Sequence, residues 1–82
     1  MKFLLKIVEN ENIVALIGKR DDMYIILESD VMGKTIEGRN WYEEYGFSID
    51  NFEIVMNKFI NVYGLEVVPL GDITIEESFY CS

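Results

Sequence analysis

One stretch of this sequence, residues 49–65, limits the fold more than any other because it carries the face, the start and the stop of an amphipathic helix. At 100° per residue its apolar side chains fill one arc, and its polar side chains lie opposite. The apolar arc consists of Phe52, Val55, Met56, Phe59, Ile60, Val62 and Tyr63. The polar side consists of Glu53, Asn57, Lys58 and Asn61. A helix with one apolar face must pack against another element, which the rest of the chain has to supply.

The two ends of this helix also carry recognisable signals. Asp50 is the expected N-cap, and Glu53 would complete a capping box with it. Ile54 is an apolar residue on the polar side, and we expect it to pack on Ile49 as a hydrophobic staple. Gly64 suits the left-handed position that follows a helix, with the next leucine closing a Schellman stop. The helix is therefore predicted to begin at the aspartate and to end just before the glycine.

The first 28 residues contain three apolar runs of strand length, at residues 2–8, 13–17 and 23–27. Residues 9–12 form a connection of hairpin length that is rich in turn-tolerant asparagine. Residues 18–22 form a second polar turn, and the run after it is apolar on both faces, which is typical of a central strand. Three sequential strands with short connections predict an antiparallel meander with one face to be covered.

The middle and the end of the chain are less regular. Residues 29–47 have no strong period, although the spacing around residues 40–43 predicts a short helical turn that ends near Gly46. After the main helix, residues 65–68 predict a fourth strand, whose end Pro69 would place at an edge or outside the ladder. A turn at residues 71–72 and a last short strand at residues 73–76 would complete the chain.

These elements predict one α+β domain over residues 1–82. An antiparallel β-meander of three N-terminal strands, joined by one strand after the helix, packs against a main helix from Asp50 to Tyr63. The predicted order is β-β-β-(short α)-α-β.

Composition supports a folded intracellular protein. Half of the residues are apolar and 27% are charged, so a core is expected. No run approaches the roughly 18 apolar residues of a membrane span. The N-terminus imitates a signal peptide, but Lys6 interrupts the apolar run and no small-residue cleavage site comes after it. Cys81 is the single cysteine and cannot form an internal disulfide, which fits a reducing compartment. We therefore expect a cytoplasmic protein.

The charge of the chain is strongly uneven. The net charge is −8, and residues 1–41 hold six basic against seven acidic side chains, whereas residues 42–82 hold one against eight. Such an acidic field disfavours nucleic acid and anionic membranes as direct partners and favours a basic protein surface. The alternative is that the net charge only keeps a small domain in solution.

The residue types that most enzymes need are scarce. The chain has no histidine, so the commonest general base and metal ligand is missing, and Cys81 has no imidazole to activate it. Its glycines form neither a dinucleotide fingerprint nor a phosphate loop. The adjacent carboxylates at residues 21–22, 43–44 and 76–77 would point apart on a strand. We therefore expect no enzyme activity, catalytic residue, cofactor or metal site, although carboxylate-only catalysis stays open.

Residues 41–47 have the most unusual composition, with four aromatic and two acidic side chains among seven residues. Tyrosine and tryptophan are frequent at interface hot spots, and carboxylates beside them can pair with basic groups on a partner. The predicted partner-binding residues are Trp41, Tyr42, Glu43, Glu44, Tyr45, Asp72, Glu76 and Glu77. The alternative is that Trp41, Tyr45 and Phe47 close the core and leave the residues between them exposed.

A second hypothesis comes from residues 46–69, G-F-S-I-D-N-F-E-I-V-M-N-K-F-I-N-V-Y-G-L-E-V-V-P. This stretch resembles the second helix of acyl carrier proteins, in which a serine begins a helix that carries an E-L-V-M-type run and a later I-E-I-P-type exit. The resemblance implies that Ser48 occupies the phosphopantetheine attachment position.

Three functions therefore compete at the level of sequence. The preferred one is a non-enzymatic inhibitor that engages a basic partner, which can be a nucleic-acid-binding protein. Its size and charge are similar to those of phage anti-restriction and anti-CRISPR proteins and of immunity proteins that neutralise basic nuclease toxins. The others are a carrier protein modified at Ser48 and a structural module that forms a homo-oligomer through a sheet edge.

Overall fold

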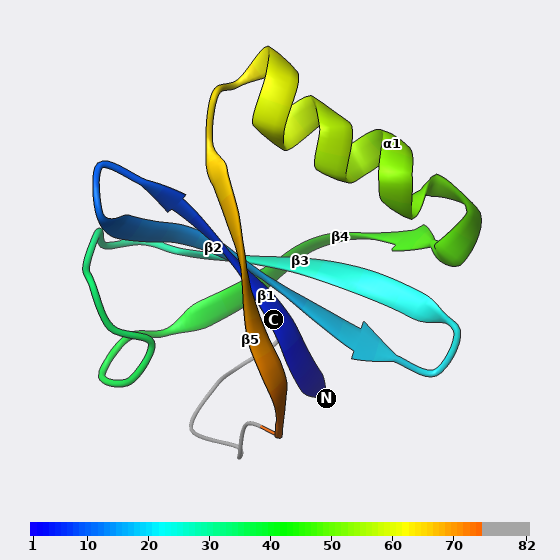
Figure 1. Ribbon diagram of the computed structural model, residues 1–82. Coiled ribbons are helices and arrows are strands. Elements are labelled where there is room, and N and C mark those ends of the chain that lie inside the picture. The colour runs from blue at the N-terminus through cyan, green and yellow to red at the C-terminus, as the bar shows by residue number, and fades with distance from the viewer. Residues whose placement is uncertain (75–82) are drawn as a thin grey trace.

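The computed structural model describes residues 1–74, which form one antiparallel sheet with a helical segment packed across it (Figure 1). The strands are β1 (Lys2–Glu9), β2 (Asn12–Arg20), β3 (Met23–Ser29), β4 (Trp41–Ser48) and β5 (Glu66–Thr74). Their order across the sheet is β4-β3-β2-β1-β5, so β4 and β5 form the two edges. The predicted α+β class is confirmed, with five strands in place of the expected four.

The two N-terminal hairpins form as the sequence predicts. Asn10 and Glu11 have φ values of 51° and 70°, the positive values that both central residues of a type I′ turn require. The β1–β2 register pairs Glu9 with Asn12 around them. The second turn is tighter than expected, because β2 continues through Arg20 and the reversal uses Asp21, with φ 56°, and its neighbour.

One face of the sheet packs against the helical segment, which runs from the end of β4 to the start of β5 (Figure 1). The buried residues of this helix-side core are Ile7, Ala15, Ile17, Ile26, Phe47 and Met56. Phe52, Val55 and Phe59 pack against it from the helix. The predicted covering of one sheet face by the main helix is thus confirmed.

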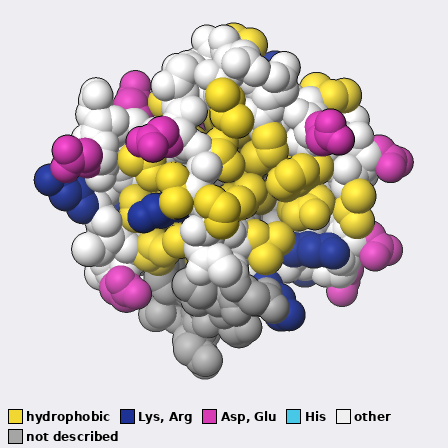
Figure 2. Space-filling model, in the orientation of Figure 1, with side chains coloured by type: hydrophobic (Ala, Val, Ile, Leu, Met, Phe, Trp, Pro, Cys, Tyr) yellow, Lys and Arg dark blue, Asp and Glu magenta, His cyan; other side chains and the backbone are white. Residues whose placement is uncertain are grey.

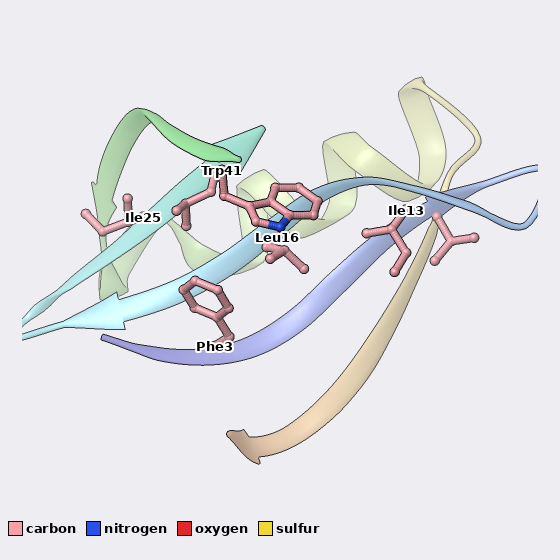
Figure 3. Packing of buried hydrophobic residues seen from close by; sticks show 7 residues of the cluster. Phe3, Ile13, Leu16, Ile25 and Trp41 are labelled. Carbon is pink, nitrogen blue, oxygen red and sulfur yellow. The ribbon is translucent and has the colours of Figure 1, made fainter. Parts of the chain in front are cut away.

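The opposite face of the sheet holds a second core, built around Trp41. Its buried residues are Phe3, Val8, Ile13, Leu16, Ile25, Leu27 and Trp41. Figure 3 shows Phe3, Leu16 and Trp41, from three different strands, pointing toward one another. Val68 and Leu70 of β5 also pack against this cluster, so it draws side chains from both edge strands. The sheet therefore curls around the Trp41 core, and the irregularities in the β1 and β4 ladders increase its twist.

Residues 41–48 form strand β4, so the predicted short helical turn in this segment is wrong. The ladder runs from Ser29–Trp41 to Met23–Ser48 and contains a bulge that leaves Glu44 without an opposite residue. In an uninterrupted strand, Trp41 and Phe47 would point to the same face. The bulge shifts the alternation, so Trp41 enters one core and Phe47 enters the other. Pairing with β3 and burial of two large rings stabilise a strand here more than the weak capping pattern at residues 40–43 could stabilise a helical turn.

The helical segment has three parts: a 3-10 turn η1 (Ile49–Asn51), α1 (Phe52–Asn57) and a π-helical turn η2 (Lys58–Val62). No side-chain cap hydrogen bond forms at the start of any part, so the predicted capping box is wrong. Gly64 has φ +69°, which confirms the predicted left-handed stop. The backbone N–H of Leu65 donates to the carbonyl oxygen of Phe59 at 3.0 Å.

The π-helical turn changes which side chains are exposed. The backbone N–H of Tyr63 donates to the carbonyl oxygen of Lys58 at 3.1 Å, a bond to the fifth preceding residue that widens the helix. The spacing of 100° per residue therefore fails at this end, and Ile60, Val62 and Tyr63 are exposed although the wheel placed them in the core.

Strand β5 is longer than predicted and lies at the edge that Pro69 requires, since proline cannot donate to a ladder. The predicted turn at residues 71–72 is absent. Gly71, with φ +80°, instead lies at an irregularity in the β1–β5 ladder, and the strand continues to Thr74. The rest of the predicted last strand lies outside the described residues.

Arg39 makes several contacts that hold the connection from β3 to β4, residues 30–40, in addition to a backbone hydrogen bond from Ile13 N–H to the carbonyl oxygen of Gly33 at 2.7 Å. The guanidinium of Arg39 donates to the carbonyl oxygens of Val31 at 2.9 Å and Ile13 at 3.1 Å, and it lies 4.3 Å from the centre of the Trp41 ring. The indole Nε1 of Trp41 donates to the carbonyl oxygen of Ile36 at 3.0 Å. Partial burial lowers the pKa of Arg39. We call these contacts the Arg39 clamp, and they fix a connection that has no regular structure of its own.

Replacing Arg39 with lysine tests the clamp. Lysine keeps the positive charge, but its single ammonium cannot bond both carbonyls while lying over the indole. We expect the free energy of unfolding to fall by about 1–3 kcal/mol in chemical denaturation. Lys34→Ala is the control, because Lys34 forms only a 3.4 Å surface ion pair with Glu11, and its effect should stay below about 1 kcal/mol. Equal stabilities of the two variants would contradict the clamp.

Candidate functional site

The structure places most of the predicted aromatic and acidic segment on the outer edge of the sheet. Trp41 is fully buried, so it serves the core and is not available to a partner. Tyr42 and Glu43 are half-buried, whereas Glu44 is exposed and Tyr45 keeps 54% of its surface. Four of the predicted residues, at positions 42–45, therefore lie together along β4. The alternative that Trp41, Tyr45 and Phe47 close the core holds for Trp41 and Phe47 and is wrong for Tyr45.

The acidic residues predicted near the C-terminus do not join this group. Asp72 belongs to β5, and three strands separate β5 from β4 in the sheet. Its side chain lies outside the described part of the structure, as do Glu76 and Glu77. The described structure therefore does not bring the two predicted acidic segments together on one edge of the sheet.

A groove separates β4 from the helical segment. It is lined by Tyr45, Ile54, Val55, Lys58, Phe59 and Tyr63 and has a volume of about 140 Å³. Ile54 and Tyr63 keep 65% and 60% of their surfaces exposed, so apolar side chains line a space open to solvent. An engineered protein cavity of about 150 Å³ holds a benzene molecule. This β4 groove can therefore accept one apolar side chain of a partner.

Sequence reasoning did not predict the helix side of the groove. Ile54 was assigned to a staple with Ile49, but the two side chains keep 65% and 50% of their surfaces exposed. Tyr63 was assigned to the core face, and the π-helical turn exposes it. The signal that could have indicated a binding surface is the isolated apolar residue on the polar side of the wheel.

The acidic side chains on and next to β4 come from two neighbouring strands. Glu28 of β3 lies opposite Tyr42 in the ladder, and burial together with the negative charge of Glu44 raises the pKa of its carboxyl. Glu43 is different, because it forms an ion pair with Arg20 across the sheet. Lys58 contributes a positive charge on the helix side of the groove. Glu28 and Glu44 thus form a repulsive carboxylate pair that a cation would stabilise.

The other edge of the sheet also exposes apolar surface. Figure 2 shows hydrophobic side chains gathered around β5 and below α1. Pro69 removes one backbone donor from this edge, and Gly71 interrupts its ladder.

Residues 1–74 give little support to a metal site, a membrane-spanning helix or a phosphopantetheine attachment site. No group of three or more acidic or cysteine side chains in this part of the chain could hold a metal ion. No helix there is long and apolar enough to cross a membrane. Ser48, the residue that the carrier resemblance assigns to phosphopantetheine, ends β4 and accepts a hydrogen bond from Asn51 Nδ2 at 3.4 Å. The carrier hypothesis stays a prediction that no described contact favours.

The comparisons with known proteins give no relative for this chain. No family model, no curated protein and no solved structure matches it.

The carboxylate pair can be tested by titration. Replacing Glu44 with glutamine should move the pKa of Glu28 down toward its ordinary value, but not fully, because burial is the larger cause and remains. NMR titration of the Glu28 side-chain carboxyl measures the change, with Glu53→Gln on the helix as the control. A Glu28 pKa that does not respond to Glu44→Gln would show that the two carboxylates do not interact.

The raised pKa of Glu28 also determines how the contribution of this carboxyl to stability changes with pH. A raised pKa means that the folded state binds the proton of Glu28 more tightly than the unfolded state does. The contribution of this carboxyl to stability is therefore fully present below the unfolded pKa and is lost as the pH rises through the folded pKa. Glu28→Gln should weaken that part of the pH dependence of unfolding.

Proposed function

We propose that this protein is a non-enzymatic binding protein that engages a basic surface of a partner protein through β4 and the β4 groove. The observation that carries the proposal is the position of Glu44 and Tyr45, both exposed on an edge strand and next to an open apolar groove. Aromatic anchors in a groove supply most of the affinity of typical interfaces, and surrounding charges set the partner and the association rate. The site combines both kinds of group.

The charge of the whole chain supports a basic partner. A net charge of −8 creates a field that attracts cationic surfaces from a distance and repels nucleic acid and anionic membranes. On β3 and β4, Glu28 and Glu44 repel each other, and a lysine or arginine placed between them would relieve that repulsion. Binding of this kind covers the basic surface of the partner. Where that surface binds nucleic acid, the protein acts as an inhibitor.

The proposal is tested by reversing one negative charge at each edge of the sheet, in two separate variants. The partner is first isolated by affinity capture from the native host with the unmodified protein as bait. We expect Glu44→Lys to slow association with that partner by about 3- to 10-fold and to reduce its dependence on salt. Association rates measured at several salt concentrations give both quantities.

Glu66→Lys is the matched control, because it makes the same charge change on an exposed residue of β5, at the other edge. The two variants alter the net charge equally, so a larger effect of Glu44→Lys locates the interface at β4. Equal effects would leave only a general attraction between opposite charges and would reject the proposed surface. A competition assay with the nucleic acid of the captured partner tests inhibition separately.

A further inference from the structure

We infer that the partner segment bound at this site is an extended, basic stretch of chain that adds to β4 as a sixth strand. The inference rests on the proposed function and specifies how the partner is held. Within residues 1–74, the sheet ends at β4, which pairs with β3 along its whole length and with no strand on its outer side. Unpaired backbone groups on an edge strand are a template for an added strand.

The two edges of the sheet differ in their ability to accept a strand. β4 has eight residues and no proline, so every residue carries a backbone N–H donor. β5 contains Pro69, which has no donor, and an irregularity at Gly71. Proline and irregular backbone are features by which edge strands avoid pairing, and β4 contains only one of them, the bulge at Glu44. β4 is therefore the edge better suited to pairing.

The helical segment gives the added strand a second surface to contact. Tyr45 of β4 forms one wall of the β4 groove. The other wall is formed by Ile54 and Val55 of α1, Lys58 and Phe59 of η2, and Tyr63. A strand paired with β4 would lie about 4.8 Å beyond it, with alternate side chains pointing to the helix side of the sheet. One of these side chains would enter the groove between Tyr45 and Ile54. An alternating basic and apolar segment fits this surface.

The charges select a basic segment over a second copy of this chain. Glu44 lies exposed in the middle of β4, and pairing two copies edge to edge would bring their Glu44 carboxylates close together. Like charges on paired strands are destabilising, and each copy also carries a net charge of −8. A lysine or arginine side chain of the partner near Glu44 would be favourable.

The experiment uses a defined set of peptides with the full-length protein. The probes are ten-residue peptides with blocked ends in which lysine alternates with valine, isoleucine or phenylalanine. Control peptides have the same composition with the lysines grouped together, so they keep the charge but lose the alternation. Amide hydrogen exchange followed by NMR reports on each β4 backbone group. We expect the alternating peptides to slow exchange at the outward-facing β4 amides by tenfold or more at saturation.

A matched pair of exposed positions tests the groove. Ile54→Asp places a charge in the groove, whereas Val62→Asp places one on the same helical segment outside it, and the native side chains keep 65% and 68% of their surfaces exposed. We expect Ile54→Asp to weaken binding of the alternating peptides at least tenfold and Val62→Asp to weaken it less than twofold. Equal effects of the two substitutions would overturn the placement of a side chain in the groove.

The remaining outcomes separate this inference from the proposed function. Equal binding of alternating and grouped peptides without protection of β4 would overturn strand addition, while the attraction to basic partners would stand. Failure of every peptide to bind would also overturn strand addition, and the Glu44→Lys and Glu66→Lys comparison would still decide the proposed function. Protection of β4 that rises with protein concentration in the absence of peptide would identify a second copy as the occupant and overturn the inference.

Discussion

The structure depends on covering both faces of one antiparallel sheet with a short chain. The helix covers one face, and no second helix is present among residues 1–74 to cover the other. The sheet solves this by curling until side chains from all of its strands meet around Trp41. A flat sheet would leave that face in water, so the bulges and the strong twist are conditions of stability. The Arg39 clamp meets the same need, because it holds the connecting segment against the indole.

The sequence predicted those parts of the fold that depend on local patterns. The hairpin at Asn10 and the helix end at Gly64 depend on backbone conformations that few residue types adopt readily. Local sequence alone therefore predicts both. β4 could not be predicted in this way, because its buried rings at Trp41 and Phe47 are related by a bulge that breaks simple alternation. The sequence also did not predict the π-helical turn, because one widened turn changes which side chains are exposed and leaves no mark in the composition.

The candidate site was predicted only on its strand side. Aromatic and acidic composition indicated residues 41–45, and the structure places them on an edge strand of the sheet but buries Trp41. The helix wall depends on a tertiary relationship, because Ile54 meets Tyr45 only once the helix crosses the sheet. Glu28 also joins through pairing of β3 with β4, which no local pattern contains. Contacts between distant segments therefore account for most of what sequence could not provide.

The position of β1 inside the sheet has a consequence for how the chain is synthesised. β1 is the first strand to emerge, yet one of its two neighbours is β5, which begins more than 50 residues later. At about 5–20 residues per second, the ribosome leaves that side of β1 unpaired for several seconds. β2 and β3 can join early, because their connections are short. The nascent chain thus passes through a stage in which β1, an interior strand of the finished sheet, is an exposed edge, and pairing with β5 then covers it.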